Sequence, residues 1–529
     1  MAALVTLPET KEEIAALIAR LSTERDEYRK LYLEALELCR KLEKGIVGPK
    51  REKLSPADAQ ITMSLLGMLL GQSAPVIEPP PPQEAAAPPR RKPTGRKPLP
   101  ENLPRVDLDV LPPEVQKLGL DAFEEIGEEV TETVERRRAS VVVVCMHKRK
   151  FVRKDRDRTE TKVFQAPAPE LPIERCIAGP ALLAHTIVQR WLDHIPLHRM
   201  ERIFGREGYP VARSTICGWH FQLAELVRPL LRAMWEDALQ APYLCTDATG
   251  VLVQNREKCR NGHFWVVAAP ERHVLFAYTP KHDSAAVDEL LAGYKGYLVA
   301  DAHAVFDHLY KSGDVVESGC WSHARRYWFK ALLTDPERAR QALALIGALF
   351  KLERANATAP PEQRLIARQR EARSVVEKYF AWCDAEVDRV LDETPSAKAI
   401  GYARNQRLAL SRFLEDGRLP IHNNFSEREL RREAVGRKNW LFLGTDDAGE
   451  VNASFVSLLA SCQLHEIEPS AYLRDLFCLL PSWPVNRVLE LAPVNWQKAL
   501  EQHDAQQRLA ANVFRRVALG EIDEHRQSK

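Results

Sequence analysis

The strongest constraint on the fold is a change of residue pattern near position 243. Segments before it space their apolar residues by three and four, as helices do. After it come three runs rich in β-branched and aromatic residues, YLCTDATGVLVQ, HFWVVAAP and HVLFAYTP, with short polar turns between them. Such runs are typical of strands, and short turns favour antiparallel pairing. The chain is therefore expected to pass here from a helical region into a sheet.

The segments after these runs alternate between helix and strand. SAAVDELLAGY predicts a helix, GYLVAD a short buried strand, and DVVESGC a further strand before the helix WSHARRYWFKALL. This is the order of a ribonuclease H-like mixed sheet, so we expect an α/β core. We divide the region into a first core part at 241–334, an all-helical insertion at 335–418, a second core part at 419–465 and a helical C-terminal tail at 466–529.

The N-terminal region predicts a coiled coil over 8–48. Positions 14, 17, 21, 24, 28, 31, 35, 38 and 42 step by three and four, and only Glu24 among them is neither apolar nor aromatic. A seam of this kind pairs helices from different chains. We therefore expect a homo-dimer or a higher oligomer, with a helix packed within its own chain as the alternative.

A proline-rich linker at 74–104 follows, because EPPPPQEAAAPPRRKPTGRKPLPENLP fits neither helix nor strand. Its basic part is similar to arms that lie in DNA minor grooves, although a solvated linker explains it equally well. The candidate DNA-binding residues in it are Arg90, Arg91, Arg96 and Lys97. Residues 105–170 predict a small α+β unit, in which the strand VVVVC precedes a basic run at 148–162 that is either a hairpin edge, a phosphate-contacting surface or a solvated face.

Residues 175–240 predict helices with a helix-turn-helix character. A helix ends at Gly208, and the next begins in YPVARSTICGW with Ser214 as its expected N-cap. In a recognition helix the first residues contact DNA, which makes Arg213, Ser214 and Thr215 candidates. A helical domain with no DNA contact shares this pattern.

Three acids in the predicted core are candidates for phosphodiester chemistry. Two Mg²⁺ ions activate the nucleophile and stabilise the leaving oxygen in such reactions, and carboxylates hold them. Asp247 lies within an apolar strand, Asp301 ends the strand GYLVAD, and Glu427 falls in the first turn of a helix that begins near Asn424. Each has an alternative: Asp247 as a turn or edge residue, Asp301 as a helix cap, and Glu427 in a capping box with Asn424.

Several long segments resemble transposases of the insertion-sequence 66 family. They include GYLVADAHAVFDHL, GCWSHARRYWFKAL, NNFSERELRREAVGRKNWLFLGT and LLAHTIVQRWLDHIPLHRMERIFGREGYPVARSTICGW. The resemblance extends from about residue 10 to 485. It implies a DDE-type transposase with the catalytic and metal-binding triad Asp247, Asp301 and Glu427, two Mg²⁺ ions replaceable by Mn²⁺, transposon-end and target DNA as partners, and small accessory proteins of the same element. Second-tier residues that match and could orient groups or contact DNA are His323, Arg325, Arg326, Asn423, Asn424, Arg428, Arg437 and Lys438.

The sequence departs from the family pattern twice. Family members carry a cysteine-rich zinc-binding segment after the linker, but residues 105–170 contain only Cys145, so no zinc is expected. His422 stands where the family has an acid before the paired asparagines. A DNA-binding protein of transposase descent that no longer cuts is therefore the alternative function, and a nuclease that does not join strands is a third possibility.

The remaining features bear on location. Ten cysteines occur without any C-x-x-C pair, which suits a reducing compartment. The N-terminus lacks the pattern of a signal peptide, and no apolar run has the length of a membrane span. These features predict a cytoplasmic protein with no membrane partner. A net charge of +2 does not by itself indicate a nucleic-acid partner.

Overall fold

The computed structural model describes residues 99–522 apart from 102, 138–139, 155–161 and 257, together with Ser22, Thr23 and Arg25, which are helical. The predicted coiled coil at 8–48 and linker at 74–104, with Arg90, Arg91, Arg96 and Lys97, therefore lie almost wholly outside the described residues. The described chain forms two compact units. A sheet-containing unit holds 98–324, 347–378 and 405–529, and a helical unit holds 325–346 and 379–404.

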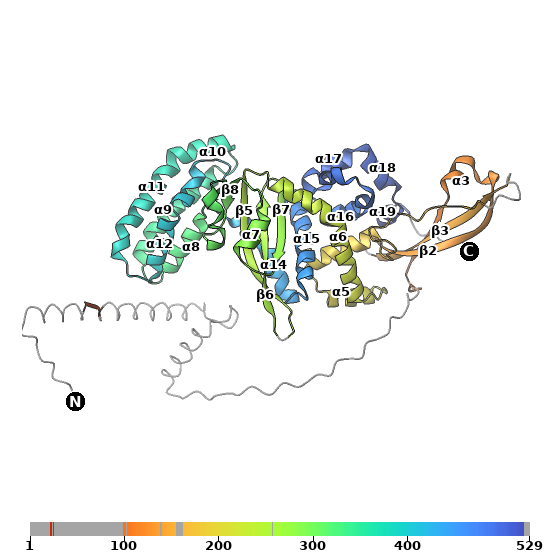
Figure 1. Cartoon of the computed structure of the whole chain (residues 1–529), viewed down its shortest axis with the longest axis horizontal. Coiled ribbons are helices and arrows are strands. Elements are labelled where there is room, and N and C mark those ends of the chain that lie inside the picture. Colours follow the sequence, from red (N-terminus) through yellow and green to blue (C-terminus); the bar gives the residue numbers. More distant parts are fainter. Residues whose placement is uncertain are drawn as a thin grey trace, which may run out of the picture. The chain divides into compact units, whose positions relative to one another are not determined.

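The sheet-containing unit has a mixed five-stranded sheet in the order β7-β6-β5-β8-β9 (Figure 1). The three strands expected from the runs after position 243 form an antiparallel meander, and the two later strands run parallel to β5. The strands are β5 (Tyr243–Val253), β6 (Arg260–Ala269), β7 (His273–Thr279), β8 (Gly296–Val299) and β9 (Val315–Ser318). Between them come α7 (Ser284–Leu290) and the 3₁₀ turns η3 (Ala304–Phe306) and η4 (Leu309–Ser312).

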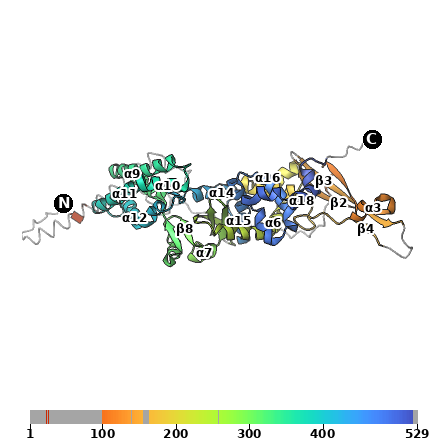
Figure 2. The same ribbon diagram turned by 90° about the horizontal axis from the view of Figure 1, so that it is seen from above.

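One outer edge of this sheet is covered by a helix. α15 (Asp446–Leu464) lies between β7 and α6 (Arg213–Ala238) and contacts both. Figure 2 shows α15 beside α6 from above. The Ser457 and Ser461 hydroxyls accept hydrogen bonds from the N–H groups of Phe276 and Val274, at 2.7 and 3.1 Å. Two backbone donors on the free side of β7 are thereby satisfied, and α15 covers this edge against pairing with another chain.

A second sheet is formed by β1 (Arg105–Val110), β2 (Phe123–Arg137), β3 (Ser140–Arg153) and β4 (Phe164–Gln165). β3 is the central strand, so the basic run that begins at Lys148 does not start at a hairpin edge, which was one of the three alternatives that the sequence left open. Two of its described cations have acidic partners: Lys148 Nζ lies 2.9 Å from Glu129, and an Arg149 guanidinium nitrogen lies 3.0 Å from Asp109. Residues 155–161 of the run lie outside the described part.

Helices account for most of the rest of the described chain. Before the five-stranded sheet come α3 (Pro113–Leu118), η1 (Leu120–Ala122), α4 (Pro180–Ile187), the π-helix η2 (Val188–Leu192) and α5 (Leu197–Arg206). After β9 come α8 (Trp321–Ala331), α9 (Pro336–Ala355), α10 (Pro361–Ala367), η5 (Arg368–Ala372), α11 (Arg373–Glu386), η6 (Val387–Arg389), α12 (Pro395–Asn405), α13 (Arg407–Ser411), η7 (Arg412–Leu414) and α14 (Asn424–Trp440). After α15 come α16 (Pro469–Leu479), η8 (Leu480–Ser482), η9 (Val485–Leu491), η10 (Pro493–Asn495), α17 (Trp496–Glu501), α18 (His503–Ala511) and α19 (Val513–Ala518).

The helical unit has its own buried centre. The indole N–H of Trp328 donates to the Tyr379 hydroxyl at 2.9 Å, and both side chains are fully buried. Arg338 bonds to Asp335 and Glu386 at its periphery. No described helix is long and apolar enough to cross a bilayer.

Candidate active site

Asp247 lies in the middle of β5, as the sequence predicted. Its strand neighbours Cys245 and Thr246 are buried, while Asp247 itself is half-buried and opposes Val266 of β6. One carboxylate oxygen accepts the Ala248 N–H at 2.8 Å. An acid in such a strand is costly unless it has partners, and the Ala248 N–H is one of them.

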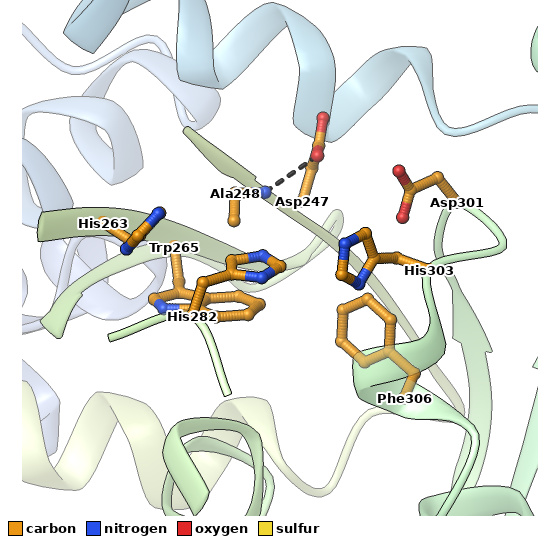
Figure 3. Close-up of a pocket in the computed structure, with 8 residues that line it drawn as sticks. All are labelled: Asp247, Ala248, His263, Trp265, His282, Asp301, His303 and Phe306. Atoms are coloured by element: carbon orange, nitrogen blue, oxygen red, sulfur yellow. Dashed lines mark hydrogen bonds between the residues drawn. The ribbon is translucent and has the colours of Figure 1, made fainter. Parts of the chain in front are cut away.

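Asp301 occupies the equivalent position beside the neighbouring strand. β5 and β8 are parallel, and the last pair in their register is Cys245 with Val299. Asp247 and Asp301 each come two residues later, at the carboxyl end of β8, where open α/β sheets place ligand-binding groups. Both line one cavity of about 270 Å³, and Figure 3 shows their carboxylates on the same side of it.

The opposite wall of the cavity is aromatic and was not predicted from the sequence. The His282 ring stacks on Trp265 at a centroid distance of 4.6 Å and an angle of 6°, and His303 meets His282 edge-on at 4.7 Å (Figure 3). Burial, with His303 and His263 nearby, lowers the pKa of His282, and burial alone lowers that of His263. These two rings are therefore neutral near pH 7 and offer hydrogen-bonding nitrogens without charge.

His303 has a defined tautomer. Its Nδ1 accepts the Val305 N–H at 3.3 Å, so this nitrogen carries no proton. With Nδ1 accepting, the ring proton is on Nε2, which makes Nε2 a hydrogen-bond donor. In Figure 3 the His303 ring lies between the His282 ring and Asp301. The only sequence signal for this residue was its place two positions after Asp301.

Glu427 comes from a different element. α14 packs against β5 and β6, and Glu427 is half-buried in its first turn, with one carboxylate oxygen 3.5 Å from Nε2 of His323. Asn424 is the first helical residue and Asn423 the N-cap, so Asn424 and Glu427 do not have the spacing of a capping box. Glu427 does not line the cavity with the two aspartates.

Asn423 links the elements that carry the acids. Its Nδ2 donates to the carbonyl oxygen of Thr246 at 2.7 Å, and its backbone N–H donates to the Cys320 sulfur at 3.1 Å. Asn423, Thr246 and Cys320 are all buried. The start of α14 is therefore fixed to β5 one residue before Asp247, and to the segment that leads into α8.

The donor set for metal is incomplete as the side chains stand. Asp247 and Asp301 offer carboxylate oxygens to one cavity, which is what Mg²⁺ needs from a protein that supplies one or two carboxylates and leaves the rest to water and phosphate. In the described part of the chain, no three His, Cys, Asp or Glu side chains gather closely enough to hold a metal ion. The pair fits Mg²⁺, and Glu427 stands outside the pair.

The other predicted contacts are spread over several surfaces. Arg437 turns inward and donates to the Thr249 hydroxyl at 3.0 Å and to the Gly250 carbonyl oxygen. Arg428 is exposed, with its guanidinium 5.1 Å from the Phe425 ring centre. The remaining predicted contact residues that are exposed are Arg325 and Arg326 on α8 and Asn424 and Lys438 on α14.

Arg213, Ser214 and Thr215 form the exposed first turn of α6, so all three are accessible as expected. The N-cap prediction was wrong. The Ala212 carbonyl accepts the first helical bonds from Thr215 and Ile216, which makes Ala212 the N-cap and leaves Ser214 inside the helix without a capping bond.

Three family models match parts of this chain. Residues 175–451, more than half of the chain, match the model of the family described as Transposase IS66 family. Residues 457–494 match the IS66 C-terminal element, and residues 36–108 match the model described as Transposase C of IS166 homeodomain.

Two curated proteins of Sinorhizobium fredii (strain NBRC 101917 / NGR234) are similar along most of their length. The chain is 27% identical over 506 residues to the uncharacterized protein y4qI, covering 91% of this chain and 92% of that protein. It is also 27% identical over 438 residues to the uncharacterized protein y4hP, covering 77% and 78%.

Proposed function

The chain belongs to the IS66 family of transposases, and from that membership we propose that it is a DDE-type DNA transposase that cuts DNA at transposon ends and joins the freed 3′-hydroxyl to target DNA. The observation that carries this proposal is the placement of Asp247 and Asp301 at register-equivalent positions, facing one cavity. The sheet order β7-β6-β5-β8-β9, with three antiparallel and then two parallel strands, supports a ribonuclease H-like core.

Asp247 and Asp301 would hold divalent metal through their carboxylates, and Glu427 would complete the set from the first turn of α14. Two Mg²⁺ ions, or Mn²⁺ in their place, would supply an activated oxygen nucleophile and a stabilised leaving oxygen. Asn423 fixes α14 to β5, so it positions Glu427 relative to Asp247. The His303 Nε2–H would donate to a non-bridging oxygen of the phosphate that enters the cavity.

The proposed reaction has two steps. In the first, a water oxygen attacks phosphorus at the transposon end, the bond to the 3′-oxygen breaks, and a 3′-hydroxyl and a 5′-phosphate result. In the second, this 3′-hydroxyl attacks a target phosphodiester, forms the new bond and releases a target 3′-hydroxyl. Exposed cations on α8 and α14 would bind the DNA backbone without reading its sequence.

Recognition of the ends would use other regions. The exposed first turn of α6, with Arg213, Ser214 and Thr215, is suited to the major groove. The basic linker residues and the N-terminal coiled coil are proposed as a DNA arm and a dimerisation element, and small accessory proteins of the same element as further partners.

A second candidate function is DNA binding without cutting. It is favoured by one observation: among the described residues, the three carboxylates do not gather into a metal-holding cluster, and Glu427 does not line the cavity. In this case the protein still binds the DNA at the transposon ends, but the three acids do not hold metal together and the DNA is not cut.

Cleavage of a plasmid that carries the DNA flanking both sides of the coding region separates the two candidates. We expect Mg²⁺-dependent nicking by the wild type, and a loss of at least about a hundredfold in Asp247→Asn and Asp301→Asn. Asp307→Asn is the matched control, because Asp307 is exposed and does not line the cavity. Cutting that survives Asp301→Asn would refute the proposed site, and wild-type binding without cutting would favour the second candidate.

A further inference from the structure

The turn after α14 holds a leucine in a conformation that leucine rarely adopts. Leu441 has φ 66° and ψ −48°, and the Phe442 N–H donates to the Trp440 carbonyl oxygen at 2.8 Å. These values define a γ-turn of the rare, strained kind. A non-glycine residue keeps such a backbone only where its surroundings enforce it, and these residues concentrate at functional sites.

Both sides of this turn are fixed. Trp440 packs against the main core and has the Arg190 guanidinium 5.7 Å from its ring centre. Leu443 is buried, its N–H donates to the Leu252 carbonyl oxygen, and its own carbonyl accepts the Gln254 N–H, each at 2.8 Å. Between these two anchors only Leu441 and Phe442 project.

The projecting pair is apolar and open to solvent. Leu441 is 64% exposed and Phe442 is 43% exposed, while Leu252, whose backbone bonds to Leu443, is 46% exposed. Three large apolar side chains at one end of β5 and α14 form a patch that packing within the chain does not explain. Such a patch marks a surface for a partner.

The surroundings of the patch are cationic. The exposed Lys438 is in the last turn of α14, and the exposed Arg256 and Lys258 lie just beyond the end of β5. The nearby Asp446 is paired with Arg260. The exposed Asp447 follows the pair in sequence, but the adjoining ends of α14 and β5 carry exposed cations. An apolar pair between cationic segments matches DNA, in which phosphates flank base pairs that apolar wedges can separate.

We propose that Leu441 and Phe442 are a wedge that inserts between base pairs of the DNA bound at the Asp247–Asp301 cavity. This inference rests on the proposed function, and it adds a site at which two stacked base pairs of the bound DNA are separated. From Asp247 to Leu252 β5 rises about 17 Å, and from Glu427 to Leu441 α14 rises about 21 Å. At about 3.4 Å per base pair, the wedge acts roughly five or six base pairs from the phosphate in the cavity.

The test uses the full chain and duplexes taken from the DNA that flanks the coding region, with 2-aminopurine placed at successive positions. This base brightens when it loses its stacking neighbours. We expect the wild type to brighten one step, roughly five or six base pairs from the cleaved bond. The double variant Leu441→Ser/Phe442→Ser should reduce that signal by about tenfold while binding the duplex within about threefold of the wild type, because the phosphate contacts remain. Leu408→Ser, which changes a leucine that is 74% exposed on α13, should leave the signal unchanged.

Each other outcome is decisive. If wild type and control bind and cut but the double variant brightens the same step equally, the wedge is refuted and the proposed function stands. If the double variant instead changes only the oligomeric state measured by sedimentation, the patch is a contact with another protein chain. If the wild type neither binds nor cuts any flanking duplex, the proposed function fails and the wedge fails with it.

Discussion

The side-chain amide of Asn423 donates a 2.7 Å hydrogen bond to the carbonyl oxygen of Thr246, and both residues are buried. Thr246 directly precedes Asp247, and Asn423 is the N-cap of the helix that carries Glu427. This bond therefore holds together two segments that carry acids far apart in sequence.

Asn423→Ala should loosen the attachment of the start of α14 to β5. The Thr246 carbonyl would lose a buried donor, which costs about 1–3 kcal/mol of unfolding free energy. DNA cleavage should fall more than DNA affinity, because the acids are displaced while the phosphate-binding cations remain. Denaturant unfolding and single-turnover cleavage measure the two effects. Asn439→Ala is the control, since the Asn439 amide bonds only to the Val435 carbonyl in its own helix. Equal losses of binding and cleavage in Asn423→Ala would count against a positioning role.

Arg368 should be a major source of stability in the segment around η5. Its side chain is fully buried, forms two bonds to Glu353 at 2.8 and 2.7 Å, and donates to the carbonyl oxygens of Phe413, Asp416 and Leu419. Arg368→Met would leave the Glu353 charge and three carbonyl groups without this donor, which should cost about 3–5 kcal/mol.

The measurement for Arg368 is urea unfolding combined with limited proteolysis of the region 347–419. Arg370→Met is the matched control, because Arg370 is exposed and its side-chain bonds are to its neighbour Glu371; it should change stability by less than about 0.5 kcal/mol. Indistinguishable unfolding of the two variants would show that other contacts carry this region.

Glu433 should make stability depend on pH. Burial raises the pKa of its carboxyl to about 7, which the Asn452 hydrogen bond and the nearby Arg190, Arg437 and Arg432 only partly offset. The folded state therefore keeps a proton that the unfolded state loses near pH 4.5. The resulting stabilisation is complete below about pH 4.5 and is lost as pH rises through about 7.

Glu433→Gln should remove this dependence. Across that window, wild-type unfolding free energy should fall relative to the variant by an amount on the order of 3 kcal/mol, as measured by denaturant unfolding at several pH values. Glu501→Gln, a change at an exposed carboxyl on α17, should track the wild type. If Glu433→Gln tracks it too, the buried carboxyl is ionised in the folded state.

The sequence contained enough to predict the strands that carry Asp247 and Asp301, because a β-branched, aromatic run with an acid inside it has few other structural solutions. It also predicted the helix of Glu427. It did not predict the aromatic wall, since Trp265 and His282 meet only when the segment after β7 returns over β6. No local spacing reports a stacking contact of that kind.

The surroundings of the basic run that begins at Lys148 could not be predicted from the sequence for a similar reason. The run that begins at Lys148 has a basic composition, but the register of β2 on β3 sets Glu129 opposite Lys148. The acids come from earlier segments, so spacing within the run cannot reveal them. The prediction of Ser214 as N-cap was wrong for a local reason. The Ala212 carbonyl oxygen accepts the bonds of the first turn, so the helix begins at Arg213, one residue before Ser214.

Leu441→Gly should change stability and DNA opening in opposite directions, because it relieves the strain of the γ-turn and also removes a side chain of the proposed wedge. Glycine adopts φ 66° without a Cβ clash, so the variant should gain about 1–3 kcal/mol in unfolding free energy. It also removes one of the two projecting side chains, so the 2-aminopurine signal in bound DNA should fall several-fold. Greater stability with poorer opening of DNA is the combination expected when strain is kept for function.

The control for Leu441→Gly is Glu466→Gly, which relieves a positive φ of 56° in an exposed residue outside the apolar patch. It should add about 1 kcal/mol at most and leave DNA opening unchanged. Thermal unfolding and fluorescence on the same duplex measure both properties. A Leu441→Gly protein that is no more stable than the wild type would mean that the turn stores no strain. A Leu441→Gly protein that is more stable than the wild type but opens DNA normally would show that Phe442 alone separates the base pairs. Phe442 is the side chain of the projecting pair that this variant keeps.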